Sequence, residues 1–192
     1  MKNKKIMSIG LSVVFCIAFS NLNVMALNNS SNYLEISDSE LKELEEFFPE
    51  DTEFSDDEVD KRLIRLGEFT QEEIDKINAE YDKSIVPFAT KVNGVNKYKT
   101  FKSNGKNYLH IYISGKTLQK IKAGANVASA LGGYIPSKFL SIAVIVISVV
   151  LGTKLDGIDT RYGIILKYVE DKWNFQGATY TYRYQGWSYQ TA

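Results

Sequence analysis

The stretch "FLSIAVIVISVVLG", residues 139–152, carries no charge, while lysines stand just outside its ends at 138 and 154. So long an uncharged run must be buried in a core or in a membrane, and the rest of the fold is arranged around it. Its β-branched residues do not alternate with polar ones, so periodicity alone does not separate a buried helix from a buried strand. The run exceeds the usual length of a strand, and Gly152 is a suitable residue to end a helix. We therefore predict a helix over residues 139–151. At about 1.5 Å per residue it is about 20 Å long, shorter than the roughly 30 Å hydrocarbon layer of a bilayer.

The residues before this stretch, 116–134, show apolar side chains at helical spacing. Gly124, Ala128 and Gly132 recur every four positions, and small residues at that spacing let a second helix approach closely, in membranes or in a small soluble core. "GGYIPSK", residues 132–138, breaks the chain. We predict a hydrophobic helical hairpin over residues 116–152, which either inserts into a membrane or forms a plain core. In the first interpretation the inserting residues are Phe139, Leu140, Ile142, Val144, Ile145, Val146, Ile147, Val149, Val150 and Leu151.

Strands are predicted on both sides of this hairpin. Residues 98–114 form a β-hairpin around Asn104-Gly105, because both central residues of such a turn need a positive φ. Residues 162–169 are apolar on both faces, as in a central strand, and residues 178–184 alternate strictly. The predicted fold class is α+β: short N-terminal helices, then a small antiparallel β unit that encloses the helical hairpin. Its last strands carry aromatic residues that suit either an interface or cross-strand packing, namely Trp173, Tyr180, Tyr182, Tyr184 and Trp187.

The N-terminus has the order of a secretory signal peptide, residues 1–26. Three lysines precede an apolar run from Ile6 to Phe19, and small residues follow at Val24 and Ala26. We predict cleavage after Ala26 and secretion. The alternative, an uncleaved membrane anchor, needs an apolar run of roughly 20 residues. The only cysteine, Cys16, lies inside the signal, so we expect no disulfide and no cysteine metal site in the exported chain.

The formal net charge of zero conceals two halves of opposite charge. Residues 28–89 hold 19 acidic and 6 basic side chains, whereas residues 90–192 hold 14 basic and 4 acidic ones. Capping boxes at residues 37–40, 55–58 and 70–73 predict three short helices in the acidic half. We interpret residues 27–89 as an acidic helical leader that masks a basic α+β domain, 90–192, like a propeptide. A solvated helical face is the alternative interpretation, and the acidic half is also a candidate partner of the basic half.

No catalytic, cofactor-binding or metal-binding residues are predicted. His110, the only histidine, stands between two tyrosines, which suits a surface or interface better than catalysis or a metal site of three or four ligands. "SGKT", residues 114–117, lacks the glycine that a phosphate-binding loop needs, because Ile111 occupies that position. We interpret it as a strand-to-helix junction. An enzyme is therefore not expected, and scattered basic residues argue against binding of nucleic acid.

The arrangement of the whole chain resembles small secreted proteins of Gram-positive bacteria, among them the non-lantibiotic, streptococcin-type bacteriocins. The resemblance is strongest from Gly115 to Trp187, where a small-residue helix, a proline turn, an Ile/Val-rich helix and an aromatic tail follow one another. It implies export, competition with related bacteria and damage to their membranes, and it carries over no catalytic residues.

Two functions are consistent with these patterns. The first is a secreted, antimicrobial, membrane-active protein whose hydrophobic hairpin acts on anionic bacterial membranes after the acidic leader is removed. Its partners would be such a membrane and a target or immunity protein. The alternative is a non-lytic secreted binding module, whose aromatic sheet binds a protein or a cell-wall component.

Overall fold

Within the described residues the protein has an α+β fold with five α-helices and a four-stranded antiparallel sheet. The computed structural model describes residues 50–85, 90–152, 154–175 and 178–192, which belong to one unit. The predicted signal peptide and the first capping box lie outside these residues. In chain order the elements are α3 (Asp56–Arg65), α4 (Gln71–Ser84), β1 (Lys97–Ser103), β2 (Lys106–Ile113), α5 (Gly115–Ala123), α6 (Val127–Leu131), α7 (Ser137–Ile145), the π-helical turn η1 (Val146–Val150), β3 (Ile164–Phe175) and β4 (Ala178–Tyr189).

The strands follow the order β1-β2-β3-β4, and each neighbouring pair is antiparallel. The predicted hairpin is confirmed: Asn104 (φ 50°) and Gly105 (φ 76°) make its turn, and Ser103 pairs with Lys106. β3 pairs with β2 on one side and with β4 on the other, so it is a central strand, as its apolar faces predicted. The helices α5, α6 and α7 make the connection from β2 to β3.

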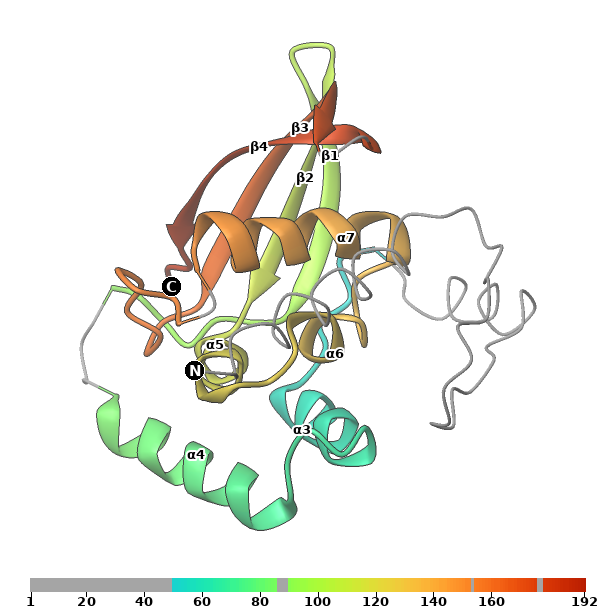
Figure 1. Ribbon diagram of the computed structural model, residues 1–192. Helices are drawn as coiled ribbons and strands as arrows, with labels where there is room; N and C mark the ends of the chain where they lie inside the picture. The colour runs from blue at the N-terminus through green and yellow to red at the C-terminus, as the bar shows by residue number, and fades with distance from the viewer. Residues whose placement is uncertain (1–49, 86–89, 153, 176–177) are drawn as a thin grey trace, which may run out of the picture. The chain divides into compact units, whose positions relative to one another are not determined.

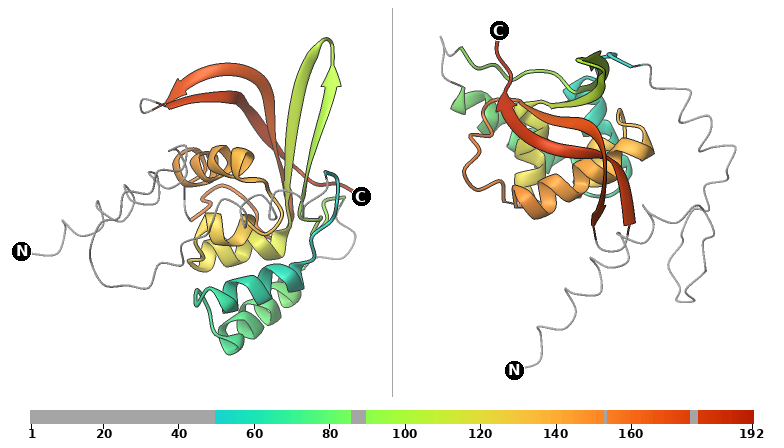
Figure 2. Two further views of the ribbon diagram at one scale, coloured as in Figure 1. Left: turned by 90° about the vertical axis from the view of Figure 1, so that its right-hand side faces the viewer. Right: turned by 90° about the horizontal axis from the view of Figure 1, so that it is seen from above.

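The described elements lie in layers (Figure 1). The sheet comes first, then α7, then α5 with α6, and α3 with α4 lie on the far side from the sheet. The left view of Figure 2 shows the curved β3–β4 ribbon arching over α7. Alternate residues of β2 and β3 face these helices, and their burial forms the centre of the core. The fully buried ones are Leu109, Ile111, Ile113, Ile164, Leu166 and Tyr168.

The apolar stretch that opened the sequence forms a helix, as predicted, with an unexpected end. α7 begins at Ser137, and its last turn widens into η1, where the Leu151 N–H donates to the Val146 carbonyl at 2.9 Å. Gly152 follows with φ 73°, in the left-handed conformation expected of a residue that ends a helix. β-Branched composition therefore did not produce a strand, because this segment packs between the sheet and α6.

The prediction of a single helix over residues 116–134 is wrong, because the structure has two helices there, α5 and α6. α5 ends at Ala123, and Gly124 closes it with φ 118°, a conformation that costs glycine little. The Asn126 side chain then caps α6 by accepting from the backbone N–H groups of Ala128 and Ser129. Residues 116–152 thus hold three helices where a two-helix hairpin was predicted.

Candidate functional site

The acidic segment docks on the basic unit. Five of the seven ion pairs among the described residues join residues 50–85 to residues 90–192. They connect Asp51 and Glu53 to the lysines of β1, and Asp60 and Asp82 to the lysines of α5. The two halves of opposite charge are therefore partners within one unit, which was one of the interpretations of the charge pattern.

Both described helices of the acidic segment, α3 and α4, begin with the predicted capping boxes. Ser55 and Glu58 exchange side-chain and backbone hydrogen bonds at the start of α3, and Thr70 and Glu73 do so at the start of α4. Each helix buries a narrow apolar stripe, which α3 places against α5 and α6 and α4 against α5. Short helices need such tertiary packing to persist. The buried stripe residues are Val59, Leu63, Ile74 and Tyr81.

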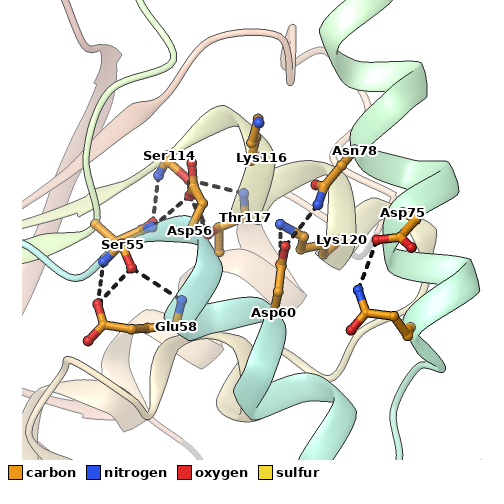
Figure 3. Close-up of polar contacts among 12 residues, drawn as sticks. Ser55, Asp56, Glu58, Asp60, Asp75, Asn78, Ser114, Lys116, Thr117 and Lys120 are labelled. Atoms are coloured by element: carbon orange, nitrogen blue, oxygen red, sulfur yellow. Dashed lines mark hydrogen bonds and ion pairs between the residues drawn. The ribbon is translucent and has the colours of Figure 1, made fainter.

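A buried ion pair lies at the centre of this contact (Figure 3). The Lys120 Nζ of α5 lies 2.5 Å from the Asp60 Oδ1 of α3, and their side chains are 0% and 11% exposed. The other oxygen of Asp60 accepts from the Asn78 Nδ2 of α4 at 2.9 Å. Beyond the ion pair, neither Lys120 Nζ nor Asp60 Oδ1 has a hydrogen-bond partner among the described residues. Each charge therefore depends on the other for compensation in a low-dielectric surrounding.

A second carboxylate of α3 enters a polar pocket at the N-terminus of α5. Asp56 Oδ1 accepts from Ser114 Oγ and from Asn96 Nδ2, the latter at 2.9 Å, and its Oδ2 accepts from Asn93 Nδ2 at 3.1 Å. Ser114 also caps α5 by accepting from the Thr117 N–H at 3.1 Å, so residues 114–117 are a strand-to-helix junction, as interpreted. A carboxylate is favoured here by the donors and by the positive end of the helix dipole.

The residues before α3 run along the edge of β1. The Asp51 N–H donates to the Tyr98 carbonyl at 2.9 Å, and the Phe54 N–H donates to the Asn96 carbonyl at 2.8 Å. Hydrogen bonds from Lys99 and Lys97 lower the pKa of the Asp51 carboxyl. Its Oδ2 lies 2.9 Å from Lys99 Nζ, and its Oδ1 lies 2.9 Å from Lys97 Nζ. The acidic segment thus covers the edge of the sheet at β1 and neutralises the two lysines beside it.

The residues predicted to insert into a membrane lie mostly in the core. Leu140, Val144 and Leu151 are half-buried, whereas Val149 and Val150, at the end of η1, are 55% and 57% exposed. Their placement is that of a core helix with one exposed end, and insertion stays a prediction. The buried members are Phe139, Ile142, Ile145, Val146 and Ile147.

The three residues predicted to pack helices do not share one face. Gly124 is exposed and ends α5, so it lies outside the expected continuous helix. Ala128 is half-buried in α6. Gly132 does sit at a close approach, because an added Cβ would lie 2.7 Å from the Ala128 carbonyl oxygen, 3.1 Å from Arg62 Nη2 and 3.4 Å from Leu140 Cδ2. Small size is therefore needed at Gly132, where α3 and α7 both approach the end of α6.

The predicted interface aromatics face the helices and one another. The Tyr182 ring meets the Phe139 ring of α7 edge-on, with centroids 5.5 Å apart, and the Tyr184 ring lies 5.7 Å from that of Tyr168. Tyr180 is buried. Trp187 is half-buried and packs edge-on against Tyr189 at 5.0 Å. The side chain of Trp173 lies outside the described part of the chain. Tyr182 and Tyr184 thus take part in helix packing and cross-strand packing, and an interface role for these aromatic residues stays a prediction.

His110 lies half-buried on the opposite face of β2, in a row of rings. Its imidazole meets the Phe101 ring edge-on at 4.8 Å, and its strand partner on β3 is Lys167. Burial lowers the pKa of His110, and the nearby charge of Lys167 lowers it further.

We expect an NMR titration of this single histidine to give a pKa below its ordinary value of about 6.5. Lys167→Met should raise that pKa, yet leave it below 6.5, because burial is the larger cause. A lowered pKa means that the contribution of His110 to stability is complete above about pH 6.5 and is lost as the pH falls through the pKa of the folded state. An unchanged pKa in Lys167→Met would contradict the assigned contact.

The sequence patterns did not reveal the pairing of Asp60 with Lys120 or the pocket around Asp56. Both aspartates stand on α3 four positions apart, as do Lys116 and Lys120 on α5, and this spacing places each pair on one helix face without indicating a partner. The pairing arises from the packing of α3 on α5, which joins segments 60 residues apart.

Comparison of the chain with models of protein families, with characterised proteins and with solved structures found no match. Among the described residues, no helix combines the length and apolar character needed to span a bilayer. The same residues contain no group of three His, Cys, Asp or Glu side chains placed to hold a metal ion.

Proposed function

We propose that this chain is the latent form of a secreted, membrane-active, bacteriocin-like protein, in which the acidic leader holds the basic unit, residues 90–192, in an inactive state. The observation that carries the proposal is the docking of the leader through five ion pairs onto lysines of the basic unit. Removing the leader would leave those lysines without their anions.

Electrostatics supports an anionic bacterial membrane as the target. Lys97 and Lys99 on β1, and Lys116 and Lys120 on α5, all pair with leader carboxylates. A basic residue near an anionic lipid surface contributes about 1 kcal/mol of binding free energy. Freeing these four lysines therefore adds several kcal/mol to the attraction, and the leader cancels it while bound.

Packing supports the hydrophobic helices as the acting element. α5 and α6 lose the cover of α3 when the leader leaves, and the apolar side chains beneath Leu63 become exposed to water. α7 and η1 carry no charged side chain between Lys138 and Lys154. We propose that the sheet shelters this element in solution and that it opens at a membrane, with Val149 and Val150 entering first.

The comparison of two preparations tests the proposal. Residues 90–192 should release dye from vesicles rich in anionic lipid, and the chain that keeps its leader should release much less. Vesicles of neutral lipid serve as the control, because they remove the electrostatic attraction. Equal inertness of both preparations on anionic vesicles would exclude the mechanism.

A second candidate function is a non-lytic binding module. It is favoured by the half-exposed row of rings on β1 and β2, where Phe101 stacks on Tyr108 at 5.3 Å beside His110 and Tyr112. Such rings suit a protein or cell-wall partner. Binding of the released unit to isolated cell walls, without any dye release, would favour this candidate.

A further inference from the structure

We propose that the acidic leader stays bound after the chain is cut between the two halves, so that the severed leader acts as a non-covalent inhibitor. The docking surface on residues 90–192 is the edge of β1, the pocket at the start of α5, and Lys120. Its occupant is the segment 50–84 of this chain as a separate polypeptide. The inhibitory role rests on the proposed function, whereas the retention does not.

Three separate anchors carry the retention. The first is the β1 edge, with its backbone hydrogen bonds from Asp51 and Phe54. The second is the pocket that holds the carboxylate of Asp56, and the third is the pair of Asp60 with the fully buried Lys120. Every one of these contacts joins a residue before 85 to a residue after 90, so cutting the chain between those positions breaks none of them.

Further contacts seat the two leader helices. Arg62 Nε donates to the Ser129 carbonyl at 2.9 Å, and the Tyr81 hydroxyl lies 2.8 Å from both Asn93 Oδ1 and the Arg161 carbonyl. The Phe54 ring stacks on that of Tyr134 at 5.7 Å. A cut leader therefore keeps an extended segment, two helices and an aromatic anchor in place, a mixture of edge pairing and helix docking typical of bound peptides.

The charge distribution predicts how the bound leader responds to salt. The pairs of Lys99 and Lys116 with the leader involve half-exposed or exposed carboxylates and are screened at high ionic strength. The pair of Lys120 with Asp60 is shielded from solvent and is screened much less. Salt alone should therefore loosen the β1 edge without releasing the leader, and release requires Lys120 to find water or another anion.

The test is made on the full chain, with the recognition sequence of a specific protease inserted between Ile85 and Thr90. After cutting, we expect both pieces to elute together from a gel-filtration column at about micromolar concentration, in physiological salt and in 1 M salt. Separate elution of the two pieces in physiological salt would overturn the retention.

Variants of the cut chain locate the anchor. Asp60→Asn should speed release of a labelled leader by on the order of a hundredfold, because the buried lysine loses its anion. Glu80→Gln is the matched control, since Glu80 is exposed on α4 and takes part in none of the five docking ion pairs, and release should stay unchanged. Leu63→Ala removes buried apolar contact without touching a charge and should also speed release, which covers the case that Asp60→Asn does not fold. Equal release rates for all the variants would contradict the proposed anchors.

Dye release then separates the two proposals. The cut complex should release as little dye from anionic vesicles as the uncut chain. When the leader is removed in denaturant and residues 90–192 are refolded, they should release dye. If the pieces stay together and the separated basic unit regains the circular dichroism of its helices and sheet yet remains inert, the retention stands and the membrane function fails. If the pieces fall apart at once and the basic unit is active, the function stands and the retention fails.

Discussion

Asp60→Asn is expected to lower the free energy of unfolding by about 3–5 kcal/mol, the range measured when one partner of a buried ion pair is removed. Asparagine keeps the size of the side chain but has a single acceptor oxygen, so when that oxygen accepts from Asn78 the amide NH2 group faces the Lys120 ammonium. The substitution therefore removes the anion of Lys120 and puts a hydrogen-bond donor in its place. Lys120, which is fully buried, would then hold an ammonium group without an anion. Because a domain is stable by only about 5–15 kcal/mol, this loss is a large part of the total. Urea unfolding followed by circular dichroism measures it.

Two control variants show whether the cause is the unpaired charge. Asp82→Asn breaks an ion pair whose carboxylate is 63% exposed, and it should change stability by less than about 1 kcal/mol. The double variant Asp60→Leu with Lys120→Met replaces both charges by apolar groups and should recover most of the loss. A double variant as unstable as Asp60→Asn alone would show that packing, and not the uncompensated charge, accounts for the effect.

Local chemistry explains what could be predicted from the sequence. A capping box satisfies backbone N–H groups within four residues, so Ser55 and Thr70 marked two helix starts without any tertiary information. Asn104-Gly105 likewise fixed a turn and, through it, the register of two strands. The helix over residues 139–151 followed from the length of its apolar run.

The break at Gly124 was missed because glycine at helical spacing has two meanings. It lets helices pack closely, or it ends a helix in the left-handed conformation, and the spacing of Gly124, Ala128 and Gly132 favours the first of these when no tertiary contact is known. Asn126, a good N-cap residue two positions later, was the local signal for a new helix start.

The docking contacts could not be predicted for a different reason. Residues 28–89 offer 19 carboxylates and residues 90–192 offer 14 basic side chains, and no local rule selects Asp60 for Lys120. The selection is made by the depth at which α3 packs on α5. Charge asymmetry therefore made the acidic half one candidate partner of the basic half, and only the fold determines which ion pair is buried.

Val146→Asp is expected to prevent folding of the chain that keeps its leader. Val146 is 4% exposed in η1, between the sheet and the helices, and a carboxylate placed there loses its hydration without gaining a partner. The cost of burying such a group exceeds the few kcal/mol by which domains are stable. Circular dichroism and gel filtration should show an unfolded or aggregated chain, and a folded Val146→Asp protein would contradict the assigned burial.

Val149→Asp is the matched variant, because the same change three residues later falls on a side chain that is 55% exposed. It should alter stability by about 0.5 kcal/mol or less, since water still reaches the carboxylate. In a membrane the comparison changes, because an aspartate costs up to about 2.5–3.5 kcal/mol at the centre of an inserted helix, and Val149 lies near the end that we propose enters first. If α7 and η1 enter the bilayer, residues 90–192 carrying Val149→Asp should remain as folded as the parent unit and lose most of their dye release. Undiminished release by that variant would place this end of the helix outside the lipid, and the aromatic face of β1 and β2 would then become the leading candidate for the contact with the target.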